Sequence, residues 1–198
     1  CVLPLFHIYA LAGIMLTAVR NGNQLILYPR PDIDQLITDL EKKKPSFLPG
    51  VPTLYTAISN HPKAKELKLS SLKICMSGGA PLPVEVQQKF EALTGATLIE
   101  GYGLTETSPT GCICPVDKTV RRVGSCGVPM QGTVVEIRDL DDPNKLLPKG
   151  KDHIGEVCII GPQVMKGYWK KPEETAQVLY STPASNWKGL RTGDTGYM

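Results

Sequence analysis

Residues 101–106 read Gly-Tyr-Gly-Leu-Thr-Glu and place an aromatic ring, a hydroxyl and a carboxylate beside two glycines. They follow the apolar, strand-like run 97–99, and ligands of open α/β sheets bind at the carboxyl ends of the strands. Tyr102 offers a face to a purine ring, Thr105 a hydroxyl to phosphate and Glu106 a hard oxygen to Mg²⁺. In isolation, however, the six residues favour a tight turn with a packed ring, followed by a helix start.

Other segments contain residues of the same kind. Residues 77–83 (Ser-Gly-Gly-Ala-Pro-Leu-Pro) follow the apolar run 74–76, and residues 190–197 (Leu-Arg-Thr-Gly-Asp-Thr-Gly-Tyr) place Asp194 among glycines. Taken singly, each has an ordinary structural interpretation: packing glycines in the first segment, and an Asx turn at Asp194 in the second. His7, in a Phe-His pair before an apolar helix, is by itself most simply a structural histidine.

Taken together, five segments resemble, in order, the signatures of the adenylate-forming enzymes, the superfamily of acyl-CoA synthetases, adenylation domains and luciferases. The segments are residues 3–7, 77–83, 101–106, 155–169 and 190–197, and they cover nearly the whole chain. The runs Leu-Pro-Leu-Phe-His-Ile-Tyr-Ala-Leu (3–11) and Gly-Pro-Gln-Val-Met-Lys-Gly-Tyr-Trp (161–169) are most similar to bacterial long-chain fatty acid–CoA ligases. One departure is the stretch 181–188, which is longer than the usual link into the Thr-Gly-Asp motif.

The resemblance implies an enzyme that uses ATP and Mg²⁺ to convert a fatty acid into an acyl-adenylate, and then CoA to form acyl-CoA. In such a reaction a carboxylate attacks the α-phosphate of ATP and pyrophosphate leaves, after which the thiol of CoA displaces AMP. Because the first step brings two anions together, the enzyme must supply positive charge and orientation around the phosphates.

The resemblance also assigns roles to residues. It makes Glu106 the Mg²⁺ ligand, Thr105 the contact of the α-phosphate and Tyr102 the ring that stacks on adenine. Asp194 would accept hydrogen bonds from both ribose hydroxyls, and His7 would act as a gate beside the acyl carboxylate. The other nucleotide-binding residues that it implies are Gly79, Ala80, Pro81, Glu100, Gly101 and Gly103, with Glu100 and Gly101 acting through backbone groups.

These roles require particular loops to meet. We expect the loops that carry Ala80, Tyr102 and Asp194 to converge on one purine-nucleoside cleft. The helix expected at 8–19, Gly78 and residues 103–104 would line the acyl tunnel.

The order of elements predicts an α/β protein. Strand and helix patterns alternate with short loops up to about residue 110, which favours a parallel sheet with flanking helices. The expected strands are 1–3, 24–28, 46–48, 73–77 and 97–100, and the expected helices are 8–19, 33–44, 52–59 and 83–94. Later runs at 123–129, 133–138 and 156–160, with one helix around 172–179, predict a mostly β subdomain shaped like a distorted barrel.

The expected domains are an α/β subdomain at 1–115 and an incomplete, mostly β subdomain at 116–198. The phosphate loop of this superfamily, and the Lys of its mobile C-terminal domain, have no counterpart in the sequence. The sequence also begins at Cys1 without an initiator Met, so we expect an internal fragment of a longer protein. By itself, such a fragment should be inactive because two phosphate-handling parts are missing.

Composition and charge exclude several classes of function. The net charge of +3 leaves no electrostatic footprint for nucleic acid. The six cysteines form no Cys-x-x-Cys pair, which indicates reduced thiols and a cytoplasmic location. The longest apolar run, at 8–19, is too short to cross a bilayer. Peripheral attachment to the inner face of the membrane and formation of a homodimer both stay open.

Two other functions also stay open. The same fold could act as an aryl–CoA ligase or load a carrier protein, since the nucleotide motifs would be identical and only the acid tunnel would differ. Alternatively, the chain could be a non-catalytic nucleotide-binding module.

Overall fold

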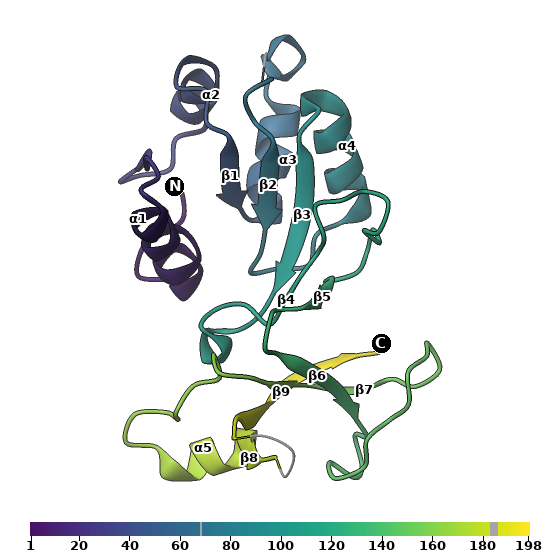
Figure 1. Ribbon diagram of the computed structural model, residues 1–198. Helices are drawn as coiled ribbons and strands as arrows, with labels where there is room; N and C mark the ends of the chain where they lie inside the picture. The colour runs from purple at the N-terminus through teal and green to yellow at the C-terminus, as the bar shows by residue number, and fades with distance from the viewer. Residues whose placement is uncertain (68, 183–185) are drawn as a thin grey trace. The chain divides into compact units, whose positions relative to one another are not determined.

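The computed structural model describes residues 1–67, 69–182 and 186–198 of the 198-residue chain (Figure 1). Residues 183–185, inside the long link expected at 181–188, lie outside the described residues. The chain divides into two compact units: the first unit contains residues 1–103 and 112–128, and the second contains residues 104–111 and 129–198. No helix within the described ranges combines the length and apolar character that crossing a bilayer requires.

Three parallel strands form the centre of the first unit (Figure 1). The sheet has the order β1-β2-β3-β4-β5, and β4 runs antiparallel to β3. The sheet is therefore mixed rather than all parallel, because residues 103–111 are too few for the crossover that a parallel β4 would need. The strands are β1 (Phe47–Gly50), β2 (Ile74–Ser77), β3 (Thr97–Tyr102), β4 (Cys112–Ile113) and β5 (Val128–Pro129).

Three helices share one hydrophobic core with this sheet, and their ends follow the signals in the sequence. Asp32 caps α2 by accepting a hydrogen bond from Gln35 N at 2.9 Å, Pro52 opens α3, and Gly95, with φ of 71°, ends α4. In the core, the rings of Tyr55 and Phe90 meet edge to face with centroids 5.0 Å apart. The elements are α2 (Ile33–Lys42), α3 (Pro52–Asn60), the short 3₁₀ helix η2 (Ala64–Glu66) and α4 (Val84–Thr94).

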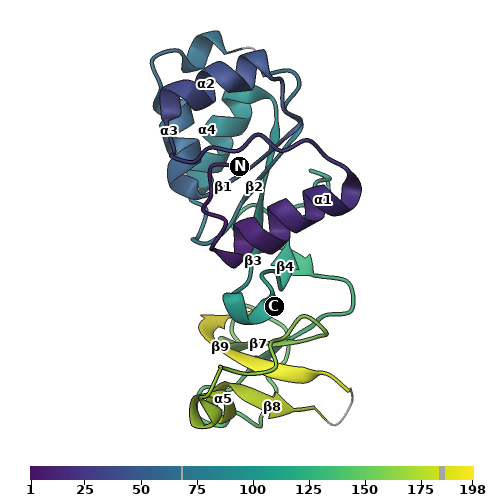
Figure 2. The ribbon, with the colours of Figure 1, turned by 90° about the vertical axis from the view of Figure 1, so that its left-hand side faces the viewer.

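The opposite face of the sheet packs against the N-terminal helical segment (Figure 2). This segment is the π-helix η1 (Tyr9–Leu16), continued by α1 (Thr17–Asn21). Cys75 joins the core under α2 to α4, whereas its neighbour Met76 packs against η1, as the alternation of a strand requires. The expected helix at 8–19 is therefore present, although most of it is the wider π form.

The strands expected at 1–3 and 24–28 are wrong. These segments make backbone hydrogen bonds to each other, from Tyr28 N to Cys1 O at 3.2 Å and from the Cys1 amino group to Ile26 O. Two such bonds at one residue do not build a ladder. Similarly, the strand expected at 123–129 shrinks to β5, because Gly124 and Gly127 adopt positive φ angles of 79° and 93° that break an extended run.

The second unit contains an antiparallel sheet with the order β6-β7-β9-β8. The predicted α/β fold followed by a mostly β part is thus confirmed, but the described strands form an open sheet instead of a barrel-like one. Strands β8 and β9 were not predicted, because the Gly and Thr residues of β9 resemble a loop. The elements are η3 (Thr105–Thr107), β6 (Val134–Arg138), β7 (Gly155–Ile160), α5 (Pro172–Val178), β8 (Leu179–Ser181) and β9 (Lys188–Gly196).

Candidate functional site

In the first unit, the loop after β2 lies beside the end of β3. Ser77 of β2 is opposite Glu100 of β3 in a parallel pair, so the residues that follow leave the sheet at the same edge. A Cβ added to Gly78 would lie 3.6 Å from Gly101 O, and Leu82 N donates a hydrogen bond to Glu100 Oε1 at 3.2 Å. The structure therefore brings together the two loops predicted to border adenine, while their contact with adenine stays a prediction.

The residues of these two loops differ in exposure. Gly79 takes a φ of 79°, which glycine adopts without strain. Burial raises the pKa of the Glu100 carboxyl, and Glu100 O accepts a hydrogen bond from Cys114 N at 2.8 Å. A backbone contact between this carbonyl and adenine must therefore use its second lone pair. The exposed residues are Gly79, Ala80 and Pro81, and the half-buried ones are Gly101, Tyr102 and Gly103.

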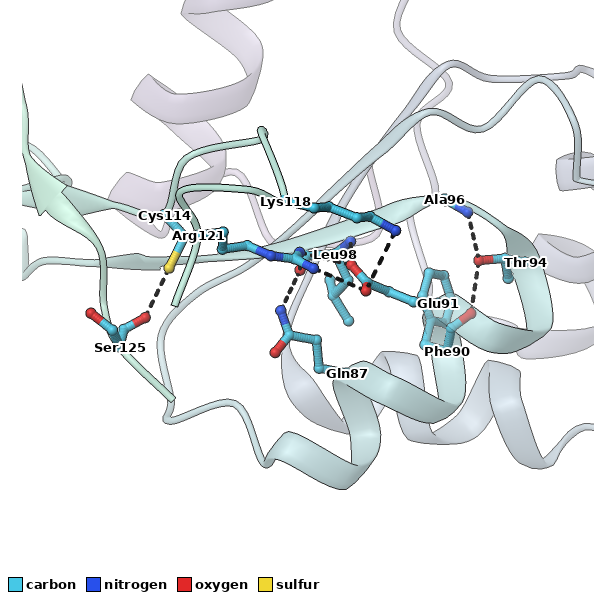
Figure 3. Close-up of polar contacts among 10 residues, drawn as sticks. All are labelled: Gln87, Phe90, Glu91, Thr94, Ala96, Leu98, Cys114, Lys118, Arg121 and Ser125. Atoms are coloured by element: carbon cyan, nitrogen blue, oxygen red, sulfur yellow. Dashed lines mark hydrogen bonds and ion pairs between the residues drawn. The ribbon is translucent and has the colours of Figure 1, made fainter. Parts of the chain in front are cut away.

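A partly buried ion pair connects β3 to α4 and to the segment after β4 (Figure 3). Arg121 donates to both carboxylate oxygens of Glu91, at 2.7 and 3.0 Å, and also to Leu98 O at 2.7 Å. Leu98 N in turn donates to Glu91 Oε1 at 2.7 Å. Burial by itself would raise the pKa of the Glu91 carboxyl, but the hydrogen bonds from Arg121 and Leu98 outweigh it and hold that pKa below its ordinary value. The network ties α4, β3 and the segment after β4 into one body.

His7 is exposed and stands at the start of η1. Its Nδ1 accepts a hydrogen bond from Tyr9 N at 3.1 Å. Tyr9 itself is buried, and its hydroxyl donates to Met76 O at 2.8 Å. Its ring would lie 3.2 Å from a Cβ added to Gly78. Tyr9, which the sequence pattern did not single out, therefore fills the space beside one residue expected to line the acyl tunnel.

In the second unit, Thr105 and Glu106 lie on the one-turn helix η3, which Thr107 stabilises by accepting a hydrogen bond from Leu104 N at 2.9 Å. Glu106 Oε1 accepts a hydrogen bond from the Tyr168 hydroxyl at 2.7 Å, and this bond raises the pKa of Tyr168. Within the described residues, Glu106 Oε2 has no hydrogen-bond partner. Thr105 is exposed. The turn thus presents one hydroxyl and one oriented carboxylate.

Asp194 lies on a bulge of β9. Glu156 pairs with Thr195 and Cys158 with Arg191, so residues 192–194 stand opposite the single residue Val157. Such bulges redirect side chains at the rims of sheets.

The bulge is held by Glu156, which is 8% exposed. Its two carboxylate oxygens accept hydrogen bonds from Arg191 Nε at 2.8 Å and from Gly193 N at 3.1 Å. Asp194 N donates to Thr192 Oγ1 at 3.1 Å, and the Asp194 side chain is exposed. The bulge therefore fixes the backbone that carries the exposed Asp194.

Mg²⁺ suits the donor set at Glu106. Protein sites for this ion use one or two carboxylates completed by water and substrate phosphates. Among the residues that the structure describes, Glu106 offers one half-buried carboxylate whose Oε2 has no hydrogen-bond partner. Across residues 1–67, 69–182 and 186–198, no cluster of three or more His, Cys, Asp or Glu side chains could hold a metal by itself. A metal at Glu106 would consequently depend on phosphate ligands.

Two residues that orient the candidate groups were missed from the sequence. Tyr168 contacts Glu106, and Glu156 fixes the turn before Asp194. Both lie in the stretch 155–169 that contributed to the resemblance, and their place in that motif was the available signal. The convergence of Ala80, Tyr102 and Asp194 on one cleft stays a prediction, since Asp194 belongs to the second unit.

A cavity of about 360 Å³ in the first unit is a separate feature. Its lining includes Tyr28, Asp39 and Lys43 and contains none of the residues predicted to bind a nucleotide.

Comparison with known proteins identifies relatives for the whole chain. The long-chain-fatty-acid–CoA ligase of Bacillus subtilis (strain 168) is 43% identical over 200 residues, covering 100% of this chain and 33% of the ligase. The 4-coumarate–CoA ligase 2 of Oryza sativa subsp. japonica is 37% identical over 202 residues, covering 100% of this chain and 34% of that enzyme. This chain thus spans about a third of the length of the curated relatives it matches.

Structural comparison agrees. ATP-bound MatB from Rhodopseudomonas palustris superposes with a TM-score of 0.86 at 30% identity, covering 99% of this chain and 37% of that one. The resemblance inferred from the five segments is confirmed. Residues 1–169 match the family described as AMP-binding enzyme, and the chain therefore belongs to that family.

Proposed function

We propose that this chain is part of an AMP-forming acyl-CoA ligase that activates a fatty acid with ATP. The observation that carries the proposal is the pairing of the glycine-rich loop after β2 with the Tyr102 end of β3, in a member of the AMP-binding enzyme family. The carboxyl edge of parallel strands is where α/β proteins bind nucleotides. The choice of a fatty acid rests on the 43% identity to a long-chain-fatty-acid–CoA ligase.

In this proposal the first unit binds the base. The ring of Tyr102 stacks on adenine, and the exposed backbone at Gly79, Ala80 and Pro81 borders the other side. The Arg121–Glu91 ion pair fixes β3, so the ring is oriented before ATP arrives. A preorganised site pays little ordering cost on binding. His7, exposed at the start of η1, contacts the acyl carboxylate.

In this proposal the second unit binds the phosphates, the metal ion and the ribose of ATP. The Asp194 carboxylate accepts hydrogen bonds from the ribose hydroxyls, the Thr105 hydroxyl donates to the α-phosphate, and Glu106 holds Mg²⁺. Bound Mg²⁺ would supply Lewis-acid stabilisation of the phosphate charge. Tyr168 keeps the Glu106 carboxylate in one orientation through its hydrogen bond of 2.7 Å. A fixed carboxylate costs no reorganisation when charge develops during the reaction.

Pyrophosphate exchange into ATP tests the proposal on the intact protein. Saturated fatty acids of increasing chain length should each be assayed against benzoate and cinnamate, with Mg²⁺ present and absent. We expect Mg²⁺-dependent exchange that rises with chain length for the fatty acids. ATP binding without exchange for any acid would instead favour the non-catalytic module. The isolated 198-residue chain should form no acyl-CoA, which a thioester assay with the same acids checks.

An aryl–CoA ligase is the second candidate, because the chain is also 37% identical to a 4-coumarate–CoA ligase. Exchange with cinnamate and none with fatty acids would favour this candidate. The assignments of Tyr102, Glu106 and Asp194 would be the same for both acids, since all three concern the nucleotide.

A further inference from the structure

Three cysteines gather behind the end of β3 in the first unit. Cys112 and Cys114 are two positions apart in an extended segment, so their side chains share one face. Cys126 lies close to this segment, and its side chain interacts with that of Cys112. Cys114 Sγ donates to Ser125 O at 2.8 Å (Figure 3). Cys112 and Cys126 are therefore neighbours in one cluster.

The backbone fixes this contact. Gly127 follows Cys126 with φ of 93°, and a Cβ added to it would lie 2.1 Å from Ile113 O. Gly127 N also donates to Ser125 Oγ at 3.1 Å. Residues 125–127 are thus pressed against the backbone of β4, and only glycine permits such a close approach. Main-chain packing therefore holds residues 125–127 beside β4, the strand that carries Cys112.

The two thiols have different environments. Cys126 is exposed, whereas Cys112 is 3% exposed. The hydrogen bond with Cys112 lowers the pKa of Cys126, and the same bond together with burial raises the pKa of Cys112. A thiolate on an accessible cysteine is the form that reacts with oxidants, and a thiol in contact can then complete a disulfide.

The other strand cysteines provide a contrast. Cys75 and Cys158 are both fully buried, and burial raises the pKa of Cys75 to about 12 and that of Cys158 to about 11. Neither has the exposure or the thiolate character that oxidation requires. The contact at Cys126 is therefore unusual within this chain.

We propose that Cys126 and Cys112 form a thiol pair that hydroperoxides oxidise to a disulfide. The Cys126 thiolate attacks one oxygen of the peroxide, the O–O bond breaks, and Cys126 becomes a sulfenic acid while hydroxide or an alkoxide leaves. The Cys112 sulfur then attacks the sulfenic sulfur. The S–O bond breaks, and the departing hydroxide takes the Cys112 proton to leave as water. A small dithiol reverses the reaction by exchange.

The disulfide acts on the strand that carries Tyr102. Cys112 is opposite Tyr102 in the β3–β4 pair, and a disulfide requires its sulfur and that of Cys126 to approach to about 2 Å. The bond draws β4 toward residues 125–127 and displaces its partner strand. This consequence rests on the proposed function: a displacement of about 1 Å at the adenine ring costs on the order of 10²-fold in rate.

Peptide mapping by mass spectrometry tests the chemistry on the intact protein. After treatment with hydrogen peroxide or cumene hydroperoxide, we expect a linked peptide pair that contains Cys112 and Cys126 and separates on addition of dithiothreitol. Cys114→Ser is the matched control, because it lies in the same cluster and should still cross-link. Cys126→Ser and Cys112→Ser should not. A link that persists in either variant, or one between other cysteines, would overturn the assignment.

Pyrophosphate exchange measured before and after peroxide tests the consequence. The unmodified protein and Cys114→Ser should lose exchange and regain it with dithiothreitol, whereas Cys126→Ser should keep it. Full exchange in a cross-linked protein would refute the effect on Tyr102. A protein that cross-links but shows no exchange with any acid would refute the proposed function and leave the thiol pair standing.

Discussion

The two units present their candidate residues in different ways. In the first unit, Tyr102 lies at the end of a central strand that the partly buried Arg121–Glu91 pair stabilises. In the second, Glu106 lies on a one-turn helix and Asp194 on a bulge, and each depends on side-chain hydrogen bonds, from Tyr168 and to Glu156 respectively. The first arrangement depends on core packing, whereas the second depends on individual side-chain hydrogen bonds.

The difference separates stability from function. Substitutions at Arg121 or Glu91 should destabilise the fold and weaken nucleotide binding together, because the same network stabilises the core and positions the strand that carries Tyr102. Substitutions at Glu106 or Asp194 should affect the reaction and leave stability nearly unchanged, because Asp194 is exposed and Glu106 is only half-buried.

The largest expected effect is on the reaction in the second unit. Glu106→Ala in the intact protein should lower the rate of adenylate formation by about 10²–10³-fold, because one oriented electrostatic contact is lost. Pyrophosphate exchange at several Mg²⁺ concentrations measures this, with thermal denaturation as the control for folding. An unchanged rate would remove Glu106 from the metal role, and a large drop in thermal stability would break the contrast between the units.

The next largest effect is on stability in the first unit. Arg121→Met should lower the free energy of unfolding by about 3 kcal/mol, because it leaves the partly buried Glu91 carboxylate with only the more distant Lys118 as a cationic partner. Urea denaturation measures the change. Lys118→Met is the matched control: Lys118 is 54% exposed and 3.7 Å from Glu91, so its loss should cost less than about 1 kcal/mol. Equal losses of unfolding free energy in the two variants would show that the Arg121–Glu91 ion pair does not stabilise the fold.

A smaller effect is expected at Tyr168. Tyr168→Phe removes the hydrogen bond to Glu106 and keeps the ring. The free energy of Mg²⁺ binding should therefore weaken by about 1 kcal/mol, because the Glu106 carboxylate is no longer held in one orientation. The Mg²⁺ concentration for half-maximal exchange should rise about fivefold. Tyr197→Phe, at an exposed ring in the same unit, serves as control. If Mg²⁺ dependence does not move, Tyr168 has no positioning role.

The smallest expected effect is on the pH dependence of stability in the first unit. The folded-state pKa of Glu91 is depressed, so its contribution to stability is fully present above the unfolded pKa of about 4.3 and is lost as the pH falls through the folded value. The stability difference between the unmodified protein and Glu91→Gln should therefore shrink below about pH 4. Urea denaturation between about pH 7 and pH 3 measures it. If the stability difference between the two proteins grew at low pH, the pKa of Glu91 would not be lowered in the folded state.

The sequence predicted best those elements whose signals are local. Helices α2, α3 and α4 were found because Asp32, Pro52 and Gly95 mark their ends independently of the rest of the chain. The strand expected at 24–28 failed because a strand requires a neighbour along its length, and apolar residues alone do not supply one. β9 was missed for the opposite reason: its partner β7 imposes an extended form on a run rich in Gly and Thr.

The candidate site shows the same limit. Tyr102, Glu106 and Asp194 were found from motifs, in which residue type and spacing are visible in the sequence. Tyr168 acts across 62 positions and Glu156 across 37, and only the folded chain shows which carboxylate or turn each one contacts. The Arg121–Glu91 pair was not predicted for this reason either, since its members are 30 positions apart.

Positions 126 and 127 differ in how freely they can be substituted. Any larger residue at 127 would place a carbon 2.1 Å from Ile113 O, so the close approach of the two backbone segments requires glycine. The neighbouring Cys126 is exposed and has no such constraint. A lineage can therefore discard oxidant sensitivity with one codon change at 126, yet it must retain the glycine beside it. Descendants of this sequence would keep the bend long after losing the sulfur that the bend once presented.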